Sequence, residues 1–155
     1  MSKPDSRKAV TRAKSLPHTS TLEVRDRCLC LAAQRAARAL ARRFDAAFAP
    51  FDLTNGQFSL LMSLNRPEPP LMRDVANLLA MDRTTLTAAL KPLERRGLVA
   101  IAVDKTDKRG RRLTLTKKGN ALLAEAYPVW VSTHDEVDAE LSDPKALRAE
   151  LWAMI

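Results

Sequence analysis

The sequence has 155 residues, 46% of them hydrophobic, which is enough for one domain with a modest core but not for two. Its 26 Lys and Arg residues outnumber 18 Asp and Glu residues, and the formal net charge of +8 predicts a polyanionic partner, either nucleic acid or an anionic lipid surface. The sequence lacks both an apolar run long enough to span a membrane and the apolar centre of a secretory signal, so we expect a cytoplasmic protein.

The first part of the chain predicts a tail and then a long helix. Residues 1–20 contain five basic residues and two prolines without apolar periodicity, which is typical of a disordered basic tail. The stretch from Leu22 to Phe48 is Ala-rich and free of Pro and Gly, which predicts one helix of about 40 Å at roughly 1.5 Å per residue. A domain of this size does not cover such a helix, so we expect a second copy of the chain to pack against it. Its apolar stripe contains Leu29, Ala33, Ala37, Leu40, Phe44 and Phe48.

Two short helices are expected in the middle of the chain, after Pro50 ends the long helix. Thr54 and Gln57 have the spacing of a capping box, which starts another helix that Pro67 terminates. The segment from Met72 to Leu79 is amphipathic, with Val75, Leu78 and Leu79 directed inward, and only two residues separate it from an Asp82 N-cap. The helix of Met72 to Leu79 and the helix that begins after Asp82 are therefore joined by a very short turn, which predicts a helix-turn-helix.

The segment from Asp82 to Leu98 has one apolar face and one face suited to DNA. Leu86, Leu90 and Leu93 form the buried stripe on a helical wheel. The opposite side and its flanks carry small, hydroxyl-bearing and cationic residues, which suit a major groove, although an ordinary solvated face has the same composition. The candidate DNA contacts are Arg83, Thr84, Thr85, Thr87, Ala88, Lys91 and Arg95. Pro92 predicts a bend or a local loss of helix near residues 88–92.

A β-hairpin with a basic tip is predicted next. Gly97 ends the helix, and Leu98 to Val103 has the length and composition of a strand. A charged turn around Gly110 follows, and Leu113 to Thr116 forms the second strand. Two helices followed by such a hairpin are the outline of a winged helix.

The C-terminal part predicts further helices and an acidic end. Lys117 opens a long helical pattern that Pro128 kinks or breaks near Glu125, and an apolar helix with Leu147 and Trp152 follows. Acidic residues gather after position 134, whereas the cations lie on the short helix and the hairpin tip. This separation of charge favours nucleic acid over a membrane surface, where one amphipathic helix would carry both basic and aromatic residues.

Three segments resemble the MarR family of bacterial transcriptional regulators: LTNGQFSLLMSL, DRTTLTAALKPLERRGLV and DKTDKRGRRLTLTKKG. In the wing, family members carry Asp-x-Arg and, eight residues after that Asp, Leu-Thr followed by Gly. The matching residues are Asp107, Arg109, Leu115, Thr116 and Gly119. The likeness extends from about Leu22 to the C-terminus.

The resemblance implies a mainly α fold with a small β-hairpin wing, in which a winged helix-turn-helix is joined to N- and C-terminal dimerisation helices. A single MarR-like domain then covers residues 21–155. Its dimerisation helices lie at about 21–49 and 117–155, and its winged helix-turn-helix lies at about 54–116. The implied function is sequence-specific binding of double-stranded DNA by a homodimer on a pseudo-palindromic operator. Such a regulator represses transcription and releases DNA when a small aromatic effector or an oxidant acts on it.

The same resemblance assigns roles within the wing. Arg109 enters a minor groove, as the negative potential of a narrow groove also favours, and Asp107 supports Arg109 or the neighbouring helix. Lys105, Lys108 and Arg111 are the remaining candidate DNA contacts of the wing.

The two cysteines leave an alternative open. On a helix Cys28 and Cys30 point about 200° apart, so they do not pair with each other. Family members that sense organic hydroperoxides place a reactive cysteine at the position of Cys30 and surround it with tyrosines. The corresponding residues here are Gln34, Phe44 and Asn55, so we favour an inert thiol and keep oxidant sensing through Cys30 as the alternative.

Enzymatic function is not expected. The sequence has no phosphate-binding Gly loop, no CxxC motif and no serine nucleophile elbow, and we predict neither cofactor nor metal site. His134 near the acidic helix is interpreted as part of a solvated helix end. A nucleic-acid-binding module without sequence preference remains the competitor from another class.

Overall fold

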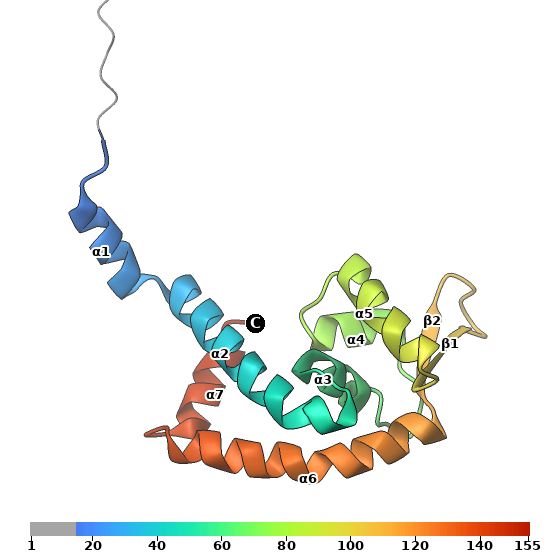
Figure 1. Cartoon of the computed structure of the whole chain (residues 1–155). Coiled ribbons are helices and arrows are strands. Elements are labelled where there is room, and N and C mark those ends of the chain that lie inside the picture. Colours follow the sequence, from blue (N-terminus) through green and yellow to red (C-terminus); the bar gives the residue numbers. More distant parts are fainter. Residues whose placement is uncertain (1–14) are drawn as a thin grey trace, which may run out of the picture. The chain divides into compact units, whose positions relative to one another are not determined.

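The protein is described over residues 15–155 of a computed structural model, so most of the predicted tail of residues 1–20 lies outside the described residues. Within the described part of the chain, residues 15–37 and residues 38–155 belong to two separate compact units, and each is described by itself. Figure 1 labels the elements. No helix among the described residues is both long and apolar enough to cross a membrane.

The predicted helix from Leu22 to Phe48 is divided in two, so the prediction of one continuous helix is wrong. Helix α1 covers His18–Arg27, and α2 covers Leu29–Phe48. Cys28 interrupts them because its backbone is extended, with φ −79° and ψ 103°. Its thiol sulfur accepts a hydrogen bond from the backbone N–H of Leu31 at 3.4 Å, as an N-cap side chain does. Cys28 therefore starts a new helix instead of continuing the first.

The second unit contains the end of α2, five further α-helices and one hairpin. After α2 come the 3₁₀ turn η1 (Ala49–Phe51) and α3 (Asn55–Ser63), which begins with the predicted capping box of Thr54 and Gln57. The remaining elements are α4 (Met72–Leu78), α5 (Arg83–Arg95), β1 (Val99–Val103), β2 (Arg111–Leu115), α6 (Lys117–Ala139) and α7 (Pro144–Trp152). The predicted mainly α fold with a small two-stranded wing is confirmed.

One apolar core joins these elements. The predicted stripe of Leu86, Leu90 and Leu93 on α5 is buried, as are Phe44 and Phe48 at the end of α2. The rest of the buried apolar core consists of Leu53, Phe58, Leu60, Leu61, Leu64, Val75, Ala76, Leu98, Val99, Leu113, Leu123, Ala126 and Val137. Leu78 was expected inside but is 46% exposed, because α4 ends there and its buried side is formed by Val75 and Ala76.

Neither internal proline ends its helix. Helix α5 is continuous through Pro92, so the predicted local loss of helix near residues 88–92 does not occur. Helix α6 likewise runs through Pro128 without a break. A proline removes one backbone hydrogen bond, and packing of an apolar face on the core compensates for that loss. On α5 the residue next to Pro92, Leu93, is fully buried and supplies such packing.

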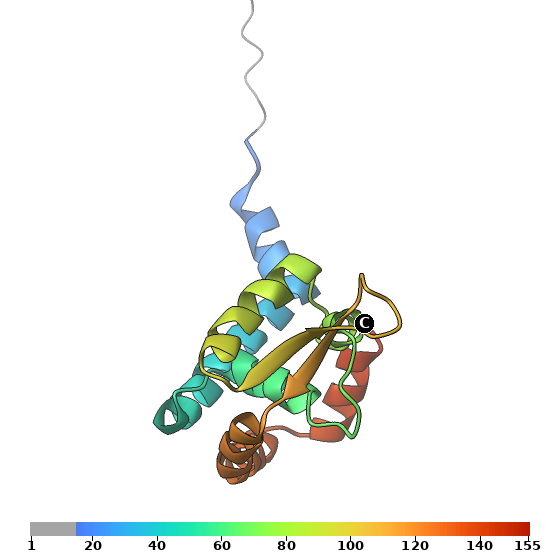
Figure 2. The ribbon, with the colours of Figure 1, turned by 90° about the vertical axis from the view of Figure 1, so that its right-hand side faces the viewer.

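The hairpin is tied to the helices through its inner residues. Val99 pairs with Leu115, Ile101 with Leu113, and Val103 with Arg111 in an antiparallel register. Leu113 donates its backbone N–H to the Pro70 carbonyl at 3.0 Å, which attaches β2 to the segment before α4. Figure 2 shows the hairpin beside α5, and β1 packs directly against that helix. The wing and the second helix of the helix-turn-helix thus share one side of this unit.

Candidate nucleic-acid interface

The turn between α4 and α5 fixes where the second helix begins. Ala80 has a left-handed backbone with φ +50°, and Met81 donates its N–H back to Ala76 O at 2.9 Å. Asp82 then caps α5 as predicted, accepting from the Thr85 backbone N–H at 2.8 Å and from the Thr85 hydroxyl at 2.7 Å. These two hydrogen bonds, the backbone one first, lower the pKa of the Asp82 carboxyl.

The outer face of α5 is open to solvent. All seven residues predicted as contacts on this helix are exposed: Arg83, Thr84, Thr85, Thr87, Ala88, Lys91 and Arg95. Because the buried leucines lie on the opposite side, this face is available for a partner along the length of the helix. It offers hydroxyls, one small apolar residue and cations. The stretch from Arg83 to Leu93 contains no carboxylate, and Glu94 is the first acidic residue after it.

The three threonine hydroxyls of α5 differ in what they offer. Thr87 donates its hydroxyl proton to Arg83 O at 2.7 Å, and Thr85 donates its own to Asp82. Both oxygens keep lone pairs for accepting, but their protons are engaged within the helix. The hydroxyl of Thr84 has no such bond among the described residues, so it is free both to donate and to accept.

The C-terminal end of α5 is held by two neighbouring segments. Arg96 donates from Nη1 to Asp52 O at 2.5 Å, which ties it to the segment after η1. The Arg96 carbonyl accepts from Lys118 Nζ at 2.8 Å, which ties it to the start of α6. Gly97 then leaves the helix with φ +70°, a left-handed conformation that favours glycine. Both ends of α5 are therefore fixed.

The Leu-Thr and Gly pattern after the hairpin has a structural role. Thr116 is the N-cap of α6, accepting from the Gly119 backbone N–H at 3.0 Å. A Cβ atom built on Gly119 would lie 2.2 Å from Leu98 O, which is too close for any side chain. The motif therefore permits α6 to start directly against the chain that leaves α5.

Asp104 organises the wing, and the sequence interpretation did not single it out. Its side chain is 4% exposed and accepts from the backbone N–H groups of Thr106 at 2.9 Å and Asp107 at 2.8 Å. It also pairs with Arg112 Nε across the hairpin. The Asp107 N–H first, and then Arg112, lower the pKa of the Asp104 carboxyl. Aspartate commonly opens a turn in this way, and its position three residues before Asp107 was the available signal.

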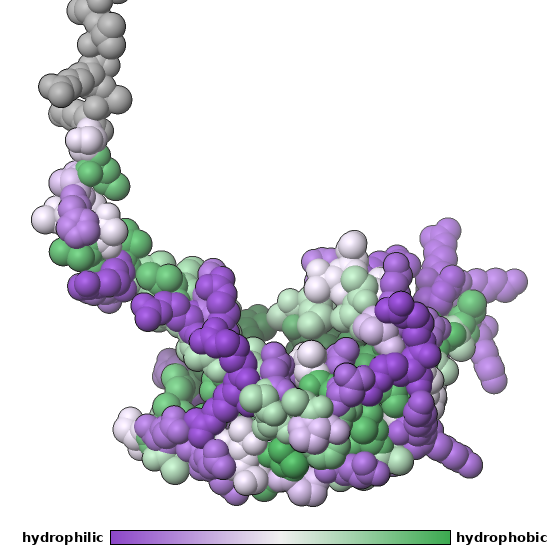
Figure 3. Space-filling model, in the orientation of Figure 1, coloured by the Kyte–Doolittle hydropathy of each residue, from purple (hydrophilic) through white to green (hydrophobic). Residues whose placement is uncertain are grey.

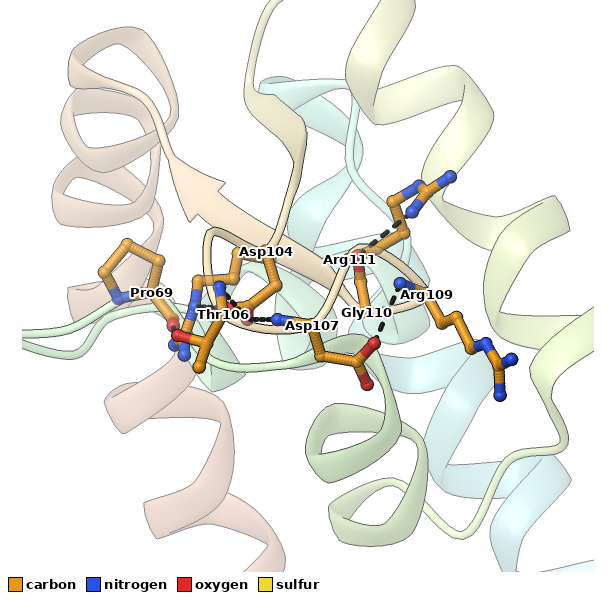
Figure 4. Close-up of polar contacts among 8 residues, drawn as sticks. Pro69, Asp104, Thr106, Asp107, Arg109, Gly110 and Arg111 are labelled. Atoms are coloured by element: carbon orange, nitrogen blue, oxygen red, sulfur yellow. Dashed lines mark hydrogen bonds and ion pairs between the residues drawn. The ribbon is translucent and has the colours of Figure 1, made fainter.

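The wing cations divide into free and engaged side chains. Lys105, Lys108 and Arg109 are exposed, and no hydrogen bond or ion pair reaches the Arg109 guanidinium from the described residues. Arg111 instead donates from Nη1 to the carbonyl oxygens of Lys108 at 3.1 Å and Gly110 at 3.0 Å. Figure 4 shows the Arg109 and Arg111 side chains directed to different sides of the tip. Arg111 thus stabilises the loop that presents Arg109.

Asp107 contacts the wing loop through both its side chain and its backbone. Its carboxylate accepts from the Arg109 backbone N–H at 3.0 Å, and its carbonyl accepts from Gly110 N at 2.7 Å. The Asp107 carboxylate thus contacts Arg109 at the main chain and not at the guanidinium.

A cavity of about 680 Å³ lies between the wing, α4 and the start of α5. Its walls combine apolar side chains such as Met72 and Met81 with the guanidinium-bearing residues Arg73, Arg83 and Arg109. Hydrophilic side chains project from the region of the hairpin (Figure 3). Five arginines and two aspartates line this cavity, so its lining carries an excess of positive charge, which suits a polyanion.

His134 is not at a solvated helix end, so that interpretation is wrong. Its ring lies 4.6 Å from Phe44 and 4.2 Å from Trp130, measured between centroids, and its Nδ1 is buried without a hydrogen-bond partner. The ring is half-buried, between Trp130 one turn earlier on α6 and Phe44 near the end of α2. No group of three His, Cys, Asp or Glu side chains suited to a metal occurs within residues 15–155.

Comparisons with known proteins agree with this geometry. The model of the MarR family matches residues 51–110. The HTH-type transcriptional regulator TtmR of Methylorubrum extorquens (strain PA1) is 34% identical over 135 residues, covering 83% of this chain and 69% of TtmR.

Solved structures of regulators bound to DNA are similar as well. The M. tuberculosis transcriptional regulator MosR, in complex with DNA, matches with a TM-score of 0.76 and 36% identity over 82% of this chain and 92% of MosR. The transcriptional repressor CouR, bound to a 23-mer DNA duplex, matches with a TM-score of 0.69 and 30% identity over 91% of this chain and 96% of CouR. This chain therefore belongs to the MarR family and is a DNA-binding transcriptional regulator with a winged-helix fold.

Proposed function

We propose that the protein represses transcription as a homodimer in which each copy inserts α5 into a major groove and Arg109 into the adjacent minor groove. The observation that carries this proposal is the solvent-exposed face of α5 beside a wing whose tip presents the Arg109 guanidinium, which no described residue pairs with. The proposed contacts are Arg83, Thr84, Thr85, Thr87, Ala88, Lys91 and Arg95 on α5, and Lys105, Lys108, Arg109 and Arg111 on the wing.

The chemistry of this face matches a DNA duplex. Threonine hydroxyls reach bases or phosphates, and Ala88 permits close approach of the helix or contacts a thymine methyl group. Lys91 and Arg95 lie toward the end of α5 and suit backbone phosphates. The free guanidinium of Arg109 suits the negative potential of a narrow minor groove.

Exposed apolar surface supports the homodimer. In the first unit Leu29 is 72% exposed, and in the second unit α7 exposes Leu151 and Trp152. Large exposed apolar residues near chain ends are typical of surfaces that a partner covers, and a second copy is the simplest partner. A symmetric dimer would present two α5 helices to half-sites about 34 Å apart on a pseudo-palindromic operator.

A cavity in the second unit supports release by a small aromatic effector. It has a volume of about 530 Å³, within the range of small-molecule sites, and lies between α3, α4 and α6. Phe58, Met62, Tyr127 and Trp130 contribute aromatic and thioether walls. A ligand there would contact the helices that support α5, so occupancy would favour one arrangement of the DNA-contacting elements over another.

Oxidant sensing remains the second candidate mode of release. Cys30 is exposed at the start of α2, so a peroxide has access to its sulfur. Substitution of Cys30 by Ser tests this mode. If the thiol is inert, peroxide leaves DNA binding of the wild-type protein and of Cys30→Ser equally unchanged, whereas a response lost in the variant assigns sensing to Cys30.

A gel-shift titration tests the proposed function. We expect the protein to retard DNA taken from upstream of its own gene in the presence of excess random duplex, and to elute as a dimer in size-exclusion chromatography with light scattering. Retardation that random duplex abolishes would instead identify a nucleic-acid-binding module without sequence preference. The logarithm of affinity should fall linearly with the logarithm of salt concentration, since Lys and Arg displace counterions from phosphates.

A further inference from the structure

We propose that Asp104 and Arg112 are positioning residues that hold the wing so that Arg109 reaches the DNA. The inference rests on the proposed function of Arg109. Neither residue needs to contact DNA for this role, because each acts on the loop of residues 105–110 or on its attachment to the helices.

Asp104 fixes the shape of the loop from inside. One oxygen of its carboxylate, Oδ1, accepts both the Thr106 N–H and the Asp107 N–H, and the other, Oδ2, pairs with Arg112. The Asp104 backbone N–H also donates to Gly110 O at 3.1 Å, which closes the base of the loop. A Cβ atom on Gly110 would lie 3.1 Å from Asp104 Cβ, so the two sides of the loop are closely packed at this point.

Arg112 connects that loop to the segment before α4. While Nε pairs with Asp104, Nη1 donates to the Pro69 carbonyl at 2.7 Å. Leu71 forms an antiparallel bridge with Arg112 next to this contact. Because Leu71 is the N-cap residue of α4, the guanidinium joins the wing to the first helix of the helix-turn-helix. Figure 4 shows Pro69, Asp104 and the loop around this contact.

This connection attaches the wing to the start of α4, which in turn packs against α5. Arg109 lies five residues beyond Asp104, at the outer side of the loop, and its own side chain has no partner among residues 15–155 that would hold it. Because the loop is already ordered in the free protein, it loses little conformational entropy when it binds DNA, and this favours association. Without the Asp104–Arg112 pair, binding would include that entropic cost.

A direct phosphate contact by Arg112 is the alternative, and the two roles predict opposite results for Asp104→Asn. If Arg112 binds phosphate, the neutral amide frees its guanidinium and affinity stays constant or rises. If the pair positions the wing, the amide loses the charged acceptor and affinity falls. We expect Asp104→Asn to weaken binding of the upstream DNA by about tenfold, which corresponds to roughly 1.4 kcal/mol.

A double-mutant cycle with Arg109 separates positioning from a general structural role. We would measure dissociation constants of the full-length protein for its upstream DNA with Arg109→Ala, Arg112→Gln and the double variant, at one salt concentration. The expected result is that Arg112→Gln weakens binding of the wild type about tenfold but adds almost nothing to Arg109→Ala. Lys91→Gln is the matched control, because it removes a cation from α5 and should act additively with Arg109→Ala.

Each outcome of the cycle is decisive. If Arg109→Ala weakens binding but Arg112→Gln has no effect or acts additively, positioning is overturned and the proposed function stands. If Arg109→Ala binds as the wild type does, the proposed wing contact fails and this inference fails with it. Thermal melting checks that each variant is folded. If Arg112→Gln does not fold, Arg112→Lys replaces it in the cycle. Lysine keeps the positive charge but cannot contact Asp104 and Pro69 at the same time, so we expect the same non-additivity.

Discussion

The hydroxyl of Thr116 donates a hydrogen bond of 2.7 Å to the carbonyl oxygen of Gly97. The Thr116 hydroxyl oxygen also caps α6 by accepting from the Gly119 backbone N–H, so one side chain joins the end of α5 to the start of α6. Because α6 packs on α3 and supplies part of the core, this link couples the DNA-contacting helix to the rest of the second unit.

Removing that link should lower stability. Thr116→Val keeps the shape of the side chain but loses the N-cap and the bond to Gly97, so we expect a loss of about 1 to 2 kcal/mol in the free energy of unfolding. Chemical denaturation measures it. Thr114→Val is the control, since Thr114 is exposed on β2, two residues before Thr116, and its replacement should change the free energy of unfolding by less than about 0.5 kcal/mol. Equal losses in the free energy of unfolding for Thr116→Val and Thr114→Val would argue against the link between α5 and α6.

Replacing Ala80, in the turn of the helix-turn-helix, with glycine should stabilise the protein. Its φ of +50° costs an L-residue roughly 1 kcal/mol, which glycine avoids. We expect Ala80→Gly to raise the free energy of unfolding by several tenths of a kcal/mol or more, after the greater entropy of the unfolded chain is subtracted. Ala88→Gly, on the exposed face in the middle of α5, should instead destabilise the protein by about 1 kcal/mol. A loss in both variants would contradict the left-handed turn.

The threonines of α5 should differ in their effect on DNA affinity. The Thr84 hydroxyl has no hydrogen-bond partner within residues 15–155, whereas the Thr87 hydroxyl donates its proton to Arg83 O. We expect Thr84→Val to weaken binding of the upstream DNA by roughly tenfold and Thr87→Val by much less, because the second change removes no available donor. Fluorescence anisotropy at fixed salt measures both. A larger loss for Thr87→Val would show that the two hydroxyls exchange roles on DNA.

The Asp82 carboxylate that caps α5 should make the stability of the protein fall at acid pH. Hydrogen bonds lower the pKa of Asp82 in the folded protein, so its contribution is present above the unfolded value near 3.8 and disappears as the pH falls through the folded value. We expect the stability difference between the wild type and Asp82→Ala to be constant near pH 7 and to shrink below about pH 4. Denaturant unfolding of both proteins from pH 7 to pH 3 measures this difference. A stability difference that grows toward low pH would contradict a lowered pKa of Asp82.

Much of the fold followed from local sequence signals. Thr54 with Gln57, the Asp82 cap, the leucine stripe of α5 and the glycine at its end each act within a few residues, so the sequence pattern alone predicted them. The hairpin was predicted with shifted ends, because pairing and not composition decides where a strand stops. The exposed face of α5 and the free Arg109 follow from the same helical and turn patterns.

The features that were missed depend on contacts between distant parts of the chain. Arg112 binds Pro69 O, which lies 43 residues away, and no periodicity reports such a contact. Helix α5 tolerates Pro92 because tertiary packing outweighs local propensity. Cys28 starts a new helix through its own sulfur, a capping role for which cysteine is not a usual residue.

Hydroxyl-radical footprinting of the upstream DNA tests the central claim most directly. We expect two protected half-sites whose centres lie about one helical turn apart, with flanking minor-groove protection that Arg109→Ala removes while the central protection remains. A single protected patch, or flanking protection that survives in Arg109→Ala, would contradict a paired molecule that holds DNA with α5 and the wing arginine.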